Sequence, residues 1–466
     1  MSERVAEHLV GRKGEILERL KALIRLPSVS TDPAYAEGMR GAREFLLARL
    51  REIGLSDVRL LEAAGGQPAV HGAWRGAPGR PTIIVYGHYD VQPPDPLELW
   101  RSPPFEPAER DGRLYARGAS DVKGSTTIAV ETVAGFLAVE GGCPVNLTLF
   151  LEGEEEVGSP SLPALIEAHR DLLRADAMLS ADGGGAAGAR PALNLGCRGI
   201  ASLGIAVRTA RKDAHSGKVG GAMRNALHEM ARLVATLHDE AGRVRVEGFE
   251  AGAAPLTPAL RAEAADRPLD EAAWYAGYGA APFGDPEFTV RERTTLRPTV
   301  EVNGMWGGYT GAGGKTVVPC EAQAKLTMRL VPGQDPAAAQ AAVRRHLERH
   351  CPPGVALEFA GREGGTRAYS LPGDHPLVAA AERVLERETG ARPTRMRLGG
   401  TVPITTMVRK KLGLHSLMFG LSSGDEDAHA PNEFFRLSSL EEGLRRWPLL
   451  LTELGRLRPE AFREGG

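Results

Sequence analysis

The stretch VNLTLFLEGEEEVGS, residues 145–159, combines two patterns that decide how the chain folds. Its first half, Val145 to Leu151, alternates apolar and polar residues and is typical of a strand. Its second half places Glu154, Glu155 and Glu156 in a row directly after that strand. Adjacent carboxylates repel one another, so the run is either a solvated loop or is held together by positive charge. The rest of the sequence has to decide between these interpretations.

The regions on either side of this stretch alternate strand-like and helix-like segments. TIIVY (82–86) and AMLS (177–180) indicate short buried strands, and residues 124–137 and 161–170 indicate helices. This alternation is typical of an α/β structure with a largely parallel sheet flanked by helices. The pattern returns near the C-terminus, with a helix expected at 375–388, a strand at 414–419 and a closing helix at 437–454.

Between these two α/β regions the order of elements changes to βαββαβ, which is typical of a ferredoxin-like α+β domain. An Ala/Pro/Gly-rich segment, 248–298, interrupts that order and is expected to hold short helices. The sequence therefore predicts one α/β domain formed by residues 1–197 and 372–466, with a smaller domain, 198–371, inserted into it. The expected elements of the smaller domain are strand 199–209, helix 222–237, strands 299–302 and 322–330, helix 336–348 and strand 355–359.

The composition argues against nucleic-acid and membrane partners. The net charge is -2, and 42% of the residues are hydrophobic, which is ordinary for a globular protein. No apolar run is expected to span a bilayer, and the charged N-terminal stretch predicts an amphipathic helix rather than a signal peptide. The 4 cysteines lack CxxC spacing, so we expect reduced thiols and a cytoplasmic location.

Acidic or imidazole side chains, which are of the types that can bind metals, directly follow each of several predicted strands of the α/β domain. Ligands in open parallel sheets bind at the carboxyl ends of the strands, so side chains that follow those strands should converge on one edge. The residues concerned are His88 and Asp90 after TIIVY, Glu155 and Glu156 after VNLTLFL, Asp182 after AMLS, His429 after LHSLMF, and Asp121 at the start of the 124–137 helix.

Two histidines and three carboxylates from this set suit a pair of divalent metals bridged by one carboxylate, with a shared water. The five candidate ligands are His88, Asp121, Glu156, Asp182 and His429. Two positive ions would also cancel the repulsion within the glutamate run. Each residue has a plainer explanation on its own: His88 as a hydrogen-bonded core residue, Asp121 as a helix cap, Asp182 as a turn residue and His429 as a surface residue. Together these explanations fit poorly, because four of the five candidate ligands follow strands of one predicted sheet.

One glycine-rich segment looks like a phosphate-binding loop but departs from its pattern. GGYTGAGGKT, residues 307–316, would need glycine at position 309, where the chain has Tyr309. We interpret it as a flexible loop.

The motifs GHYDVQP, ARGASDVKG, EGEEEVGS, SADGG, DAHSG and AHAPNE, in this order, resemble the M20 family of dinuclear metallopeptidases. The likeness is strongest to the branch of cytosolic nonspecific dipeptidase, carnosinase and bacterial dipeptidases, and it covers nearly the whole chain. It implies metal-dependent hydrolysis of the amide bond of dipeptides or short peptides. It also implies a homodimer joined through the smaller, lid domain.

The resemblance further implies two divalent metal ions per subunit, with zinc expected and manganese or cobalt as alternatives. His88 and Asp182 match the ligands of one metal. Glu156 and His429 match the ligands of the other, and Asp121 matches the carboxylate that bridges both.

Four more residues match catalytic positions of the family. Asp90 matches the residue that orients the metal-binding His88, and Glu155 matches the general base that activates the shared water. His215 matches the histidine that reaches the partner subunit's active site and donates to the oxyanion. Arg329 matches the arginine that holds the substrate carboxylate.

The loop around Gly400 and Thr401 matches a substrate-binding loop, but the chain departs from the family there. Eukaryotic dipeptidases of the branch carry glutamate where this chain has Leu398, and many members have a second aspartate where it has Val122. Leu398 keeps a second function open, that of an N-acyl or N-carbamoyl amino-acid amidohydrolase on the same fold. A catalytically inactive binding protein is a further alternative, and the complete set of candidate ligands argues against it.

Overall fold

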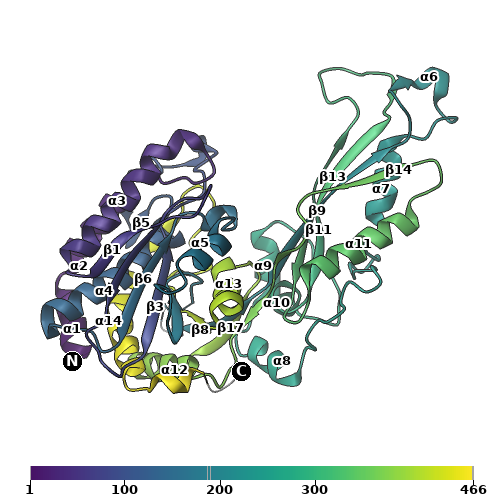
Figure 1. Cartoon of the computed structure of the whole chain (residues 1–466). Helices are drawn as coiled ribbons and strands as arrows, with labels where there is room; N and C mark the ends of the chain where they lie inside the picture. Colours follow the sequence, from purple (N-terminus) through teal and green to yellow (C-terminus); the bar gives the residue numbers. More distant parts are fainter. Residues whose placement is uncertain (1, 186, 189, 464–466) are drawn as a thin grey trace. The chain divides into compact units, whose positions relative to one another are not determined.

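The computed structural model describes residues 2–185, 187–188 and 190–463 (Figure 1). Residue 1 and residues 464–466, which the expected domain ranges include, lie outside the described residues. The chain divides into two compact units. Unit 1 consists of Met1–Leu195, Leu371–Met396 and Val402–Gly466, and unit 2 of Gly196–Ser370 and Arg397–Thr401.

Unit 1 is built on a sheet with the strand order β1-β2-β6-β3-β7-β18-β8. The central strands β6, β3, β7 and β18 pair in parallel, whereas the strands on either side of them pair antiparallel. Almost every residue of β3, β6 and β7 is buried, as expected for strands covered on both faces. The predicted α/β class with its parallel sheet is confirmed, while the antiparallel edges were not anticipated. The strands are β1 (Ser56–Leu61), β2 (Ala69–Trp74), β3 (Thr82–His88), β6 (Asn146–Glu152), β7 (Ala177–Ser180), β8 (Ala192–Cys197) and β18 (Ser416–Met418).

Helices flank this sheet (Figure 1). Helix α4 packs against α1 and α14, and α5 packs against α13. The stretch Ala119–Glu140 is long and apolar enough to cross a membrane by length and composition, which we did not expect from the sequence, but it is mostly buried and is typical of a core helix. The helices are α1 (Ser2–Gly11), α2 (Lys13–Ile24), α3 (Ala36–Glu52), α4 (Gly124–Glu140), α5 (Leu162–Ala168), α12 (Pro376–Thr389), α13 (Pro403–Leu412) and α14 (Leu437–Gly455).

A small antiparallel sheet in unit 1 joins two segments that are far apart in sequence. It has the order β19-β5-β4, with strands β4 (Ala108–Arg110), β5 (Arg113–Tyr115) and β19 (Phe434–Arg436). It therefore fixes the chain just before Asp121 against the chain just after His429.

Unit 2 has the predicted βαββαβ order, and its antiparallel sheet runs β11-β13-β9-β14. Strand β9 alternates buried and more exposed residues, so one face of the sheet packs on the core beneath α7 and α11. The elements are β9 (Gly199–Arg208), α7 (Ala226–Ala235), β11 (Thr299–Gly307), β13 (Glu321–Leu330), α11 (Pro336–His350) and β14 (Ala356–Ala360).

The interrupting segment 248–298 contains the expected short helices, α8 (Pro258–Ala265), α9 (Glu271–Gly277) and α10 (Val290–Thr295). The glycine-rich segment forms a loop after β11, as predicted, and leads to the two-residue strand β12 (Val317–Val318) rather than to a helix. Strand β12 pairs with β10 (Ala214–His215), which precedes the short helix α6 (Ser216–Val219).

Candidate metal centre

The sheet of unit 1 brings the predicted ligands together at the carboxyl ends of its parallel strands. His88 is the last residue of β3, and Asp182 follows the end of β7. Glu156 lies in a short helical turn, Glu155–Val157, that follows β6. Asp121 lies in the turn Ala119–Lys123 that leads into α4, and His429 lies in the loop between β18 and β19.

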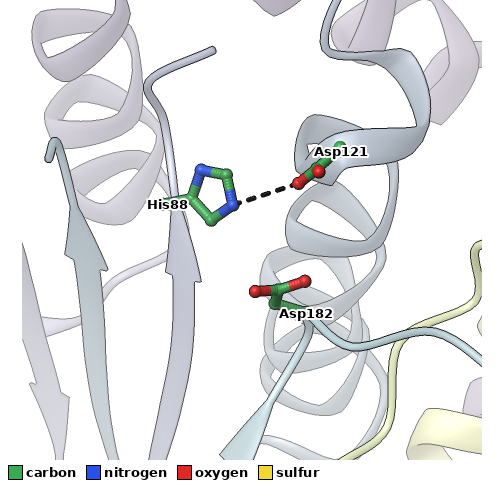
Figure 2. Close-up of side chains that lie close together, drawn as sticks. All are labelled: His88, Asp121 and Asp182. Carbon is green, nitrogen blue, oxygen red and sulfur yellow. Dashed lines mark ion pairs between the residues drawn. The ribbon is translucent and has the colours of Figure 1, made fainter. Parts of the chain in front are cut away.

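These side chains form two groups that share Asp121. His88, Asp121 and Asp182 form one group, and Asp121, Glu156 and His429 form the other; within each, the ligand atoms lie within 4.8 Å of one another. Figure 2 shows the first group, in which the three side chains point toward one another from different elements. Oδ1 of Asp121 lies 3.3 Å from Nε2 of His88, whereas its Oδ2 lies 2.9 Å from Nε2 of His429. One carboxylate therefore serves both groups, each through a different oxygen.

Unsatisfied polar atoms inside the cluster indicate that it is built for cations. His88 is fully buried, and within the described part of the chain its Nε2 has no hydrogen-bond partner. Oε1 of Glu156 is buried and likewise lacks a partner among the described residues. Leaving such atoms unpaired costs about 1–3 kcal/mol each, which coordination of a metal ion would remove. The mixed nitrogen and oxygen donors suit a borderline divalent metal.

The carboxyl groups of the cluster resist ionisation when they are without a cation. Burial, and then the charge of neighbouring carboxylates, raises the pKa of Glu155 well above its usual range and also raises the pKa of Glu156. The same causes raise the pKa of Asp182 to about 6. So many buried negative charges are unstable together, and divalent cations would stabilise their ionised forms.

The two histidines respond to the same charges in the opposite sense. Hydrogen bonding to Asp121 and Glu156 raises the pKa of His429 to about 10. Burial acts to lower the pKa of His88, but the neighbouring carboxylates of Asp121 and Asp90 outweigh it and raise the pKa well above its ordinary value. A metal ion binds only the neutral imidazole, so raised pKa values of this kind oppose binding until a proton is displaced.

Asp90 connects His88 to the glutamate turn. Nδ1 of His88 lies 3.0 Å from the backbone oxygen of Asp90, which leaves Nε2 facing the cluster. The Asp90 carboxylate accepts hydrogen bonds from the backbone N–H groups of Glu155 at 3.2 Å and Glu156 at 3.0 Å. The hydroxyl of Ser30 also donates to this carboxylate at 2.8 Å. Sequence reasoning missed Ser30, because nothing in its local sequence links it to a strand that lies so far along the chain.

The glutamates of residues 152–156 have two different roles: some hold the surrounding chain, and others face the ligand groups. The hydroxyl of Tyr86 donates to Glu152 at 2.8 Å, and the backbone N–H of Gln67 donates to Glu154 at 2.9 Å. These two carboxylates therefore hold the surrounding chain. Glu156 instead lies 3.1 Å from Nε2 of His429 and accepts a hydrogen bond from Gln92 at 3.0 Å. Gln92 was also missed, although it stands within the GHYDVQP motif.

His215 belongs to unit 2, where it caps helix α6. Its ring is exposed, and its Nδ1 accepts a hydrogen bond from the backbone N–H of Gly217 at 2.9 Å. A neutral imidazole that accepts at Nδ1 carries its proton on Nε2. With Nδ1 accepting this bond, Nε2 of His215 is the ring nitrogen that can donate.

Arg329, Thr401 and Arg198 form a linked set within unit 2. The guanidinium of Arg329 donates to the Thr401 hydroxyl at 3.1 Å, and that hydroxyl donates to the backbone oxygen of Arg198 at 2.7 Å. Arg198 in turn donates to the backbone oxygens of Gly399 at 2.9 Å and Arg297 at 3.1 Å, and so fixes the loop that contains Gly400. Among the described residues neither guanidinium forms an ion pair with a carboxylate. Sequence reasoning did not single out Arg198.

A sequence model for peptidase family M20/M25/M40 matches residues 84–453, a range that contains all the candidate ligands. The chain is 27% identical to the Cys-Gly metallodipeptidase dug1 of Schizosaccharomyces pombe, over 98% of this chain and 99% of that protein. It is also 27% identical to the beta-Ala-His dipeptidase of Homo sapiens, over 98% of this chain and 93% of that protein.

Solved structures give the same picture of the fold. The structure of human carnosine dipeptidase 1 matches with a TM-score of 0.84 and 26% identity, covering 98% of this chain and 99% of that one. The M20 family metallo-carboxypeptidase Sso-CP2 from Sulfolobus solfataricus matches with a TM-score of 0.83 and 29% identity, covering 95% of this chain and 100% of that one.

Proposed function

Since the chain belongs to peptidase family M20/M25/M40, we propose that it hydrolyses the amide bond of dipeptides or short peptides at a centre of two divalent metal ions. The chain is a metal-dependent dipeptidase, as its relatives are. The observation that carries the two-metal centre is the pair of ligand groups joined by Asp121, each with one histidine and one further carboxylate.

Zinc is the metal that we propose, with manganese and cobalt as alternatives. The donor set of imidazole nitrogen and carboxylate oxygen suits all three. His88 and Asp182 would hold one ion, and Glu156 and His429 the other. The bound ions would polarise the scissile carbonyl and lower the pKa of the attacking water.

Glu155 is the residue that we assign to proton transfer. It neighbours Glu156, yet it belongs to neither ligand group within the described chain, so its carboxylate remains available. Burial raises the pKa of Glu155, which brings a carboxylate closer to the pKa that a general base needs at neutral pH. In the proposed reaction Glu155 takes a proton from the attacking water and returns it to the leaving amine.

Arg329 would bind the free carboxylate at the C-terminal end of the substrate. Its guanidinium and that of Arg198 lie near each other, and Arg329 contributes, after burial, to lowering the pKa of Arg198 to about 10. The charge of Glu301 partly offsets this effect on Arg198, but among the described residues neither guanidinium forms an ion pair, so the two neighbouring cations make a site for a carboxylate. Two relatives are named for the dipeptides Cys-Gly and beta-Ala-His, and a third is named a carboxypeptidase. The substrates in these names all end in a free carboxylate.

A substrate panel tests this function. We expect hydrolysis of Cys-Gly and beta-Ala-His, and a kcat/KM about 10–100-fold lower for the same dipeptides with a C-terminal amide, because a hydrogen bond to a charged group contributes about 1.5–3 kcal/mol. The Arg329→Met variant should show the same kcat/KM for the dipeptide and for its C-terminal amide. Equal rates for acid and amide in the unchanged enzyme would contradict the assignment of Arg329.

Leu398 is the observation that favours the second candidate function. An apolar side chain at the end of strand β17 (Thr394–Leu398) stands where the resemblance implies a glutamate in eukaryotic dipeptidases of the branch. The neighbouring Arg397 is paired with Glu263 at 2.5 Å. The panel therefore includes N-acetyl and N-carbamoyl amino acids. Faster hydrolysis of these than of free dipeptides would make the chain an N-acyl amino-acid amidohydrolase.

We propose that the chain acts as a homodimer joined through unit 2. Strand β11 is the edge strand of its sheet and exposes Val302, Met305 and Trp306, and Tyr309 is exposed in the loop that follows. Apolar side chains on an unpaired edge strand are typical of an interaction surface. None of the 4 cysteines, all of which lie among the described residues, forms a disulfide, which supports a reducing compartment; a cytoplasmic location stays a prediction.

His215 should serve the active site of the partner subunit. As a donor to the oxyanion, His215→Ala is expected to lower kcat by about 10²–10³-fold without loss of metal. Mixing inactive His215→Ala with inactive Glu155→Gln should restore activity, because half of the sites in a mixed dimer then combine an intact Glu155 with an intact His215. The measurement is activity after subunit exchange, with mixed dimers verified by mass. Mixed dimers as inactive as their parents would show that His215 does not act across the interface.

A further inference from the structure

The loop that carries Asp121 is held by a buried carboxylate, that of Glu433. Glu433 is fully buried. Its Oε2 accepts hydrogen bonds from the guanidinium of Arg117 at 2.6 Å and the backbone N–H of Gly118 at 3.0 Å. Its Oε1 accepts from the backbone N–H groups of Ser120 at 2.9 Å and Asp121 at 3.0 Å. Both oxygens are thus occupied by the loop that ends in the shared ligand.

The backbone around Glu433 explains how this carboxylate reaches the loop. Strand β19 begins at Phe434 and pairs with β5, and the backbone N–H of Ala116 donates to the backbone oxygen of Glu433 at 3.0 Å. Glu433 also follows His429 closely in the chain. It therefore connects the two segments that supply Asp121 and His429.

We propose that Glu433 is a positioning residue for the metal centre, which holds the peptide of Asp121 so that the two oxygens of Asp121 face the two ligand groups at once. This inference rests on the proposed two-metal function. The separation of Oδ1 toward His88 and Oδ2 toward His429 requires one orientation of Asp121, and that orientation depends on where its backbone lies. Glu433 fixes that backbone directly at the N–H of Asp121.

Replacement by glutamine would break this arrangement on one side. A glutamine amide has one accepting oxygen and one NH₂ donor, so the NH₂ group would face one of the two donor pairs now bound by Glu433. Loss of a residue that orients metal ligands lowers metal affinity by about 10–100-fold. Because Asp121 is shared, both metal sites should weaken together, whereas loss of an unshared ligand should weaken one.

A matched control separates this effect from simple loss of a buried ion pair. Glu131 on α4 is also buried and paired with arginine, as Glu433 is with Arg117: its carboxylate accepts from Arg49 at 2.8 and 2.7 Å and lies 3.1 Å from Nε of Arg19. Glu131→Gln removes such a pair without touching a candidate ligand. It should lower thermal stability and leave metal affinity unchanged.

The experiment titrates metal-free protein with Zn²⁺ against a chromophoric chelator, and with Co²⁺ followed by absorption. Glu433→Gln is expected to lower the affinity of both sites by about 10–100-fold, and Glu131→Gln to lower neither. Asp182→Asn and Asp121→Asn give the reference patterns for one weakened site and two. If Glu433→Gln does not fold, Glu433→Asp takes its place, because the shorter side chain cannot span both donor pairs.

The outcomes distinguish this inference from the function on which it rests. Wild-type affinity, or weakening of one site only, in the folded Glu433 variant would overturn the positioning role while Asp121→Asn still weakens both sites. Two sites of wild-type affinity in Asp121→Asn would instead overturn the shared-ligand centre itself.

Discussion

Removing divalent metal from the purified protein is expected to abolish hydrolysis, and adding Zn²⁺, Mn²⁺ or Co²⁺ is expected to restore it. The physical reason lies in the two ligand groups joined by Asp121. Among the described residues, Nε2 of His88 and Oε1 of Glu156 are buried without a hydrogen-bond partner, and metal ions would bind both atoms. Water alone is a poor nucleophile at neutral pH, and the metals would supply both its activation and the polarisation of the carbonyl. The measurement is the rate of dipeptide hydrolysis against metal content determined by mass spectrometry.

Metal uptake should also release protons, which gives a readout that does not depend on activity. Hydrogen bonding to Asp121 and Glu156 raises the pKa of His429 to about 10, so at pH 7 this imidazole is protonated in the metal-free cluster. A metal can bind only the neutral ring, so binding must displace the proton. Affinity should therefore increase as the pH rises toward 10 and weaken as it falls. A pH indicator in weakly buffered solution would detect the release.

Full activity in verified metal-free protein would contradict the proposed centre as a whole. Restoration by Mg²⁺ alone would contradict the choice of a borderline metal, because Mg²⁺ binds through oxygen ligands and retains its waters. A control for chelator damage is the circular dichroism of the stripped protein, which should keep its helix content.

The parts of the fold that could be predicted from sequence are those that depend on the local pattern of apolar and polar residues. Buried runs such as TIIVY and VNLTLFL became the central parallel strands β3 and β6, and the ligands that follow them meet because those strands end at one edge. The βαββαβ order of unit 2 could be predicted for the same reason, since each element has its own periodicity. The antiparallel edge strands β1 and β2 could not, because strand direction depends on pairing partners rather than on composition.

The supporting residues of the centre were missed because their partners lie far away in sequence. Ser30 touches the Asp90 carboxylate, and Glu433 touches the N–H of Asp121, yet neither stands next to its partner in the chain. Arg198 was missed for another reason: its guanidinium binds backbone oxygens, and backbone oxygens leave no signature in a sequence. Motif reasoning finds side chains that carry chemistry, whereas the residues that orient them become visible only in three dimensions.

Glu155→Gln and Glu156→Gln should separate proton transfer from metal binding. The two residues are adjacent, and the Asp90 carboxylate holds both of their backbone N–H groups, so neither substitution removes the support of the turn. The pair is therefore matched in position, charge change and size. Any difference between the variants must come from what each carboxylate does.

Glu155→Gln is expected to lower turnover by about 10²–10⁴-fold, the range for loss of a general base, while both metals stay bound. Glutamine cannot accept the proton of the attacking water, yet it leaves the groups around Asp121 complete. Glu156→Gln is expected to weaken one metal site, because Glu156 is the carboxylate that accompanies His429. The measurements are kcat on a dipeptide and the number and affinity of bound metal ions for each variant.

Glu155 and Glu156 are neighbouring carboxylates, and either could in principle be the general base or the metal ligand. A result with the two roles exchanged would therefore also be informative. If Glu155→Gln lost metal and Glu156→Gln kept both ions but turned over slowly, the two assignments would be exchanged. That exchange would require Gln92 to hold the base rather than a ligand, since its side chain donates to Glu156 at 3.0 Å. Gln92→Leu then distinguishes the cases: it should weaken metal binding if Glu156 is a ligand, and change only kcat and its pH profile if Glu156 is the base.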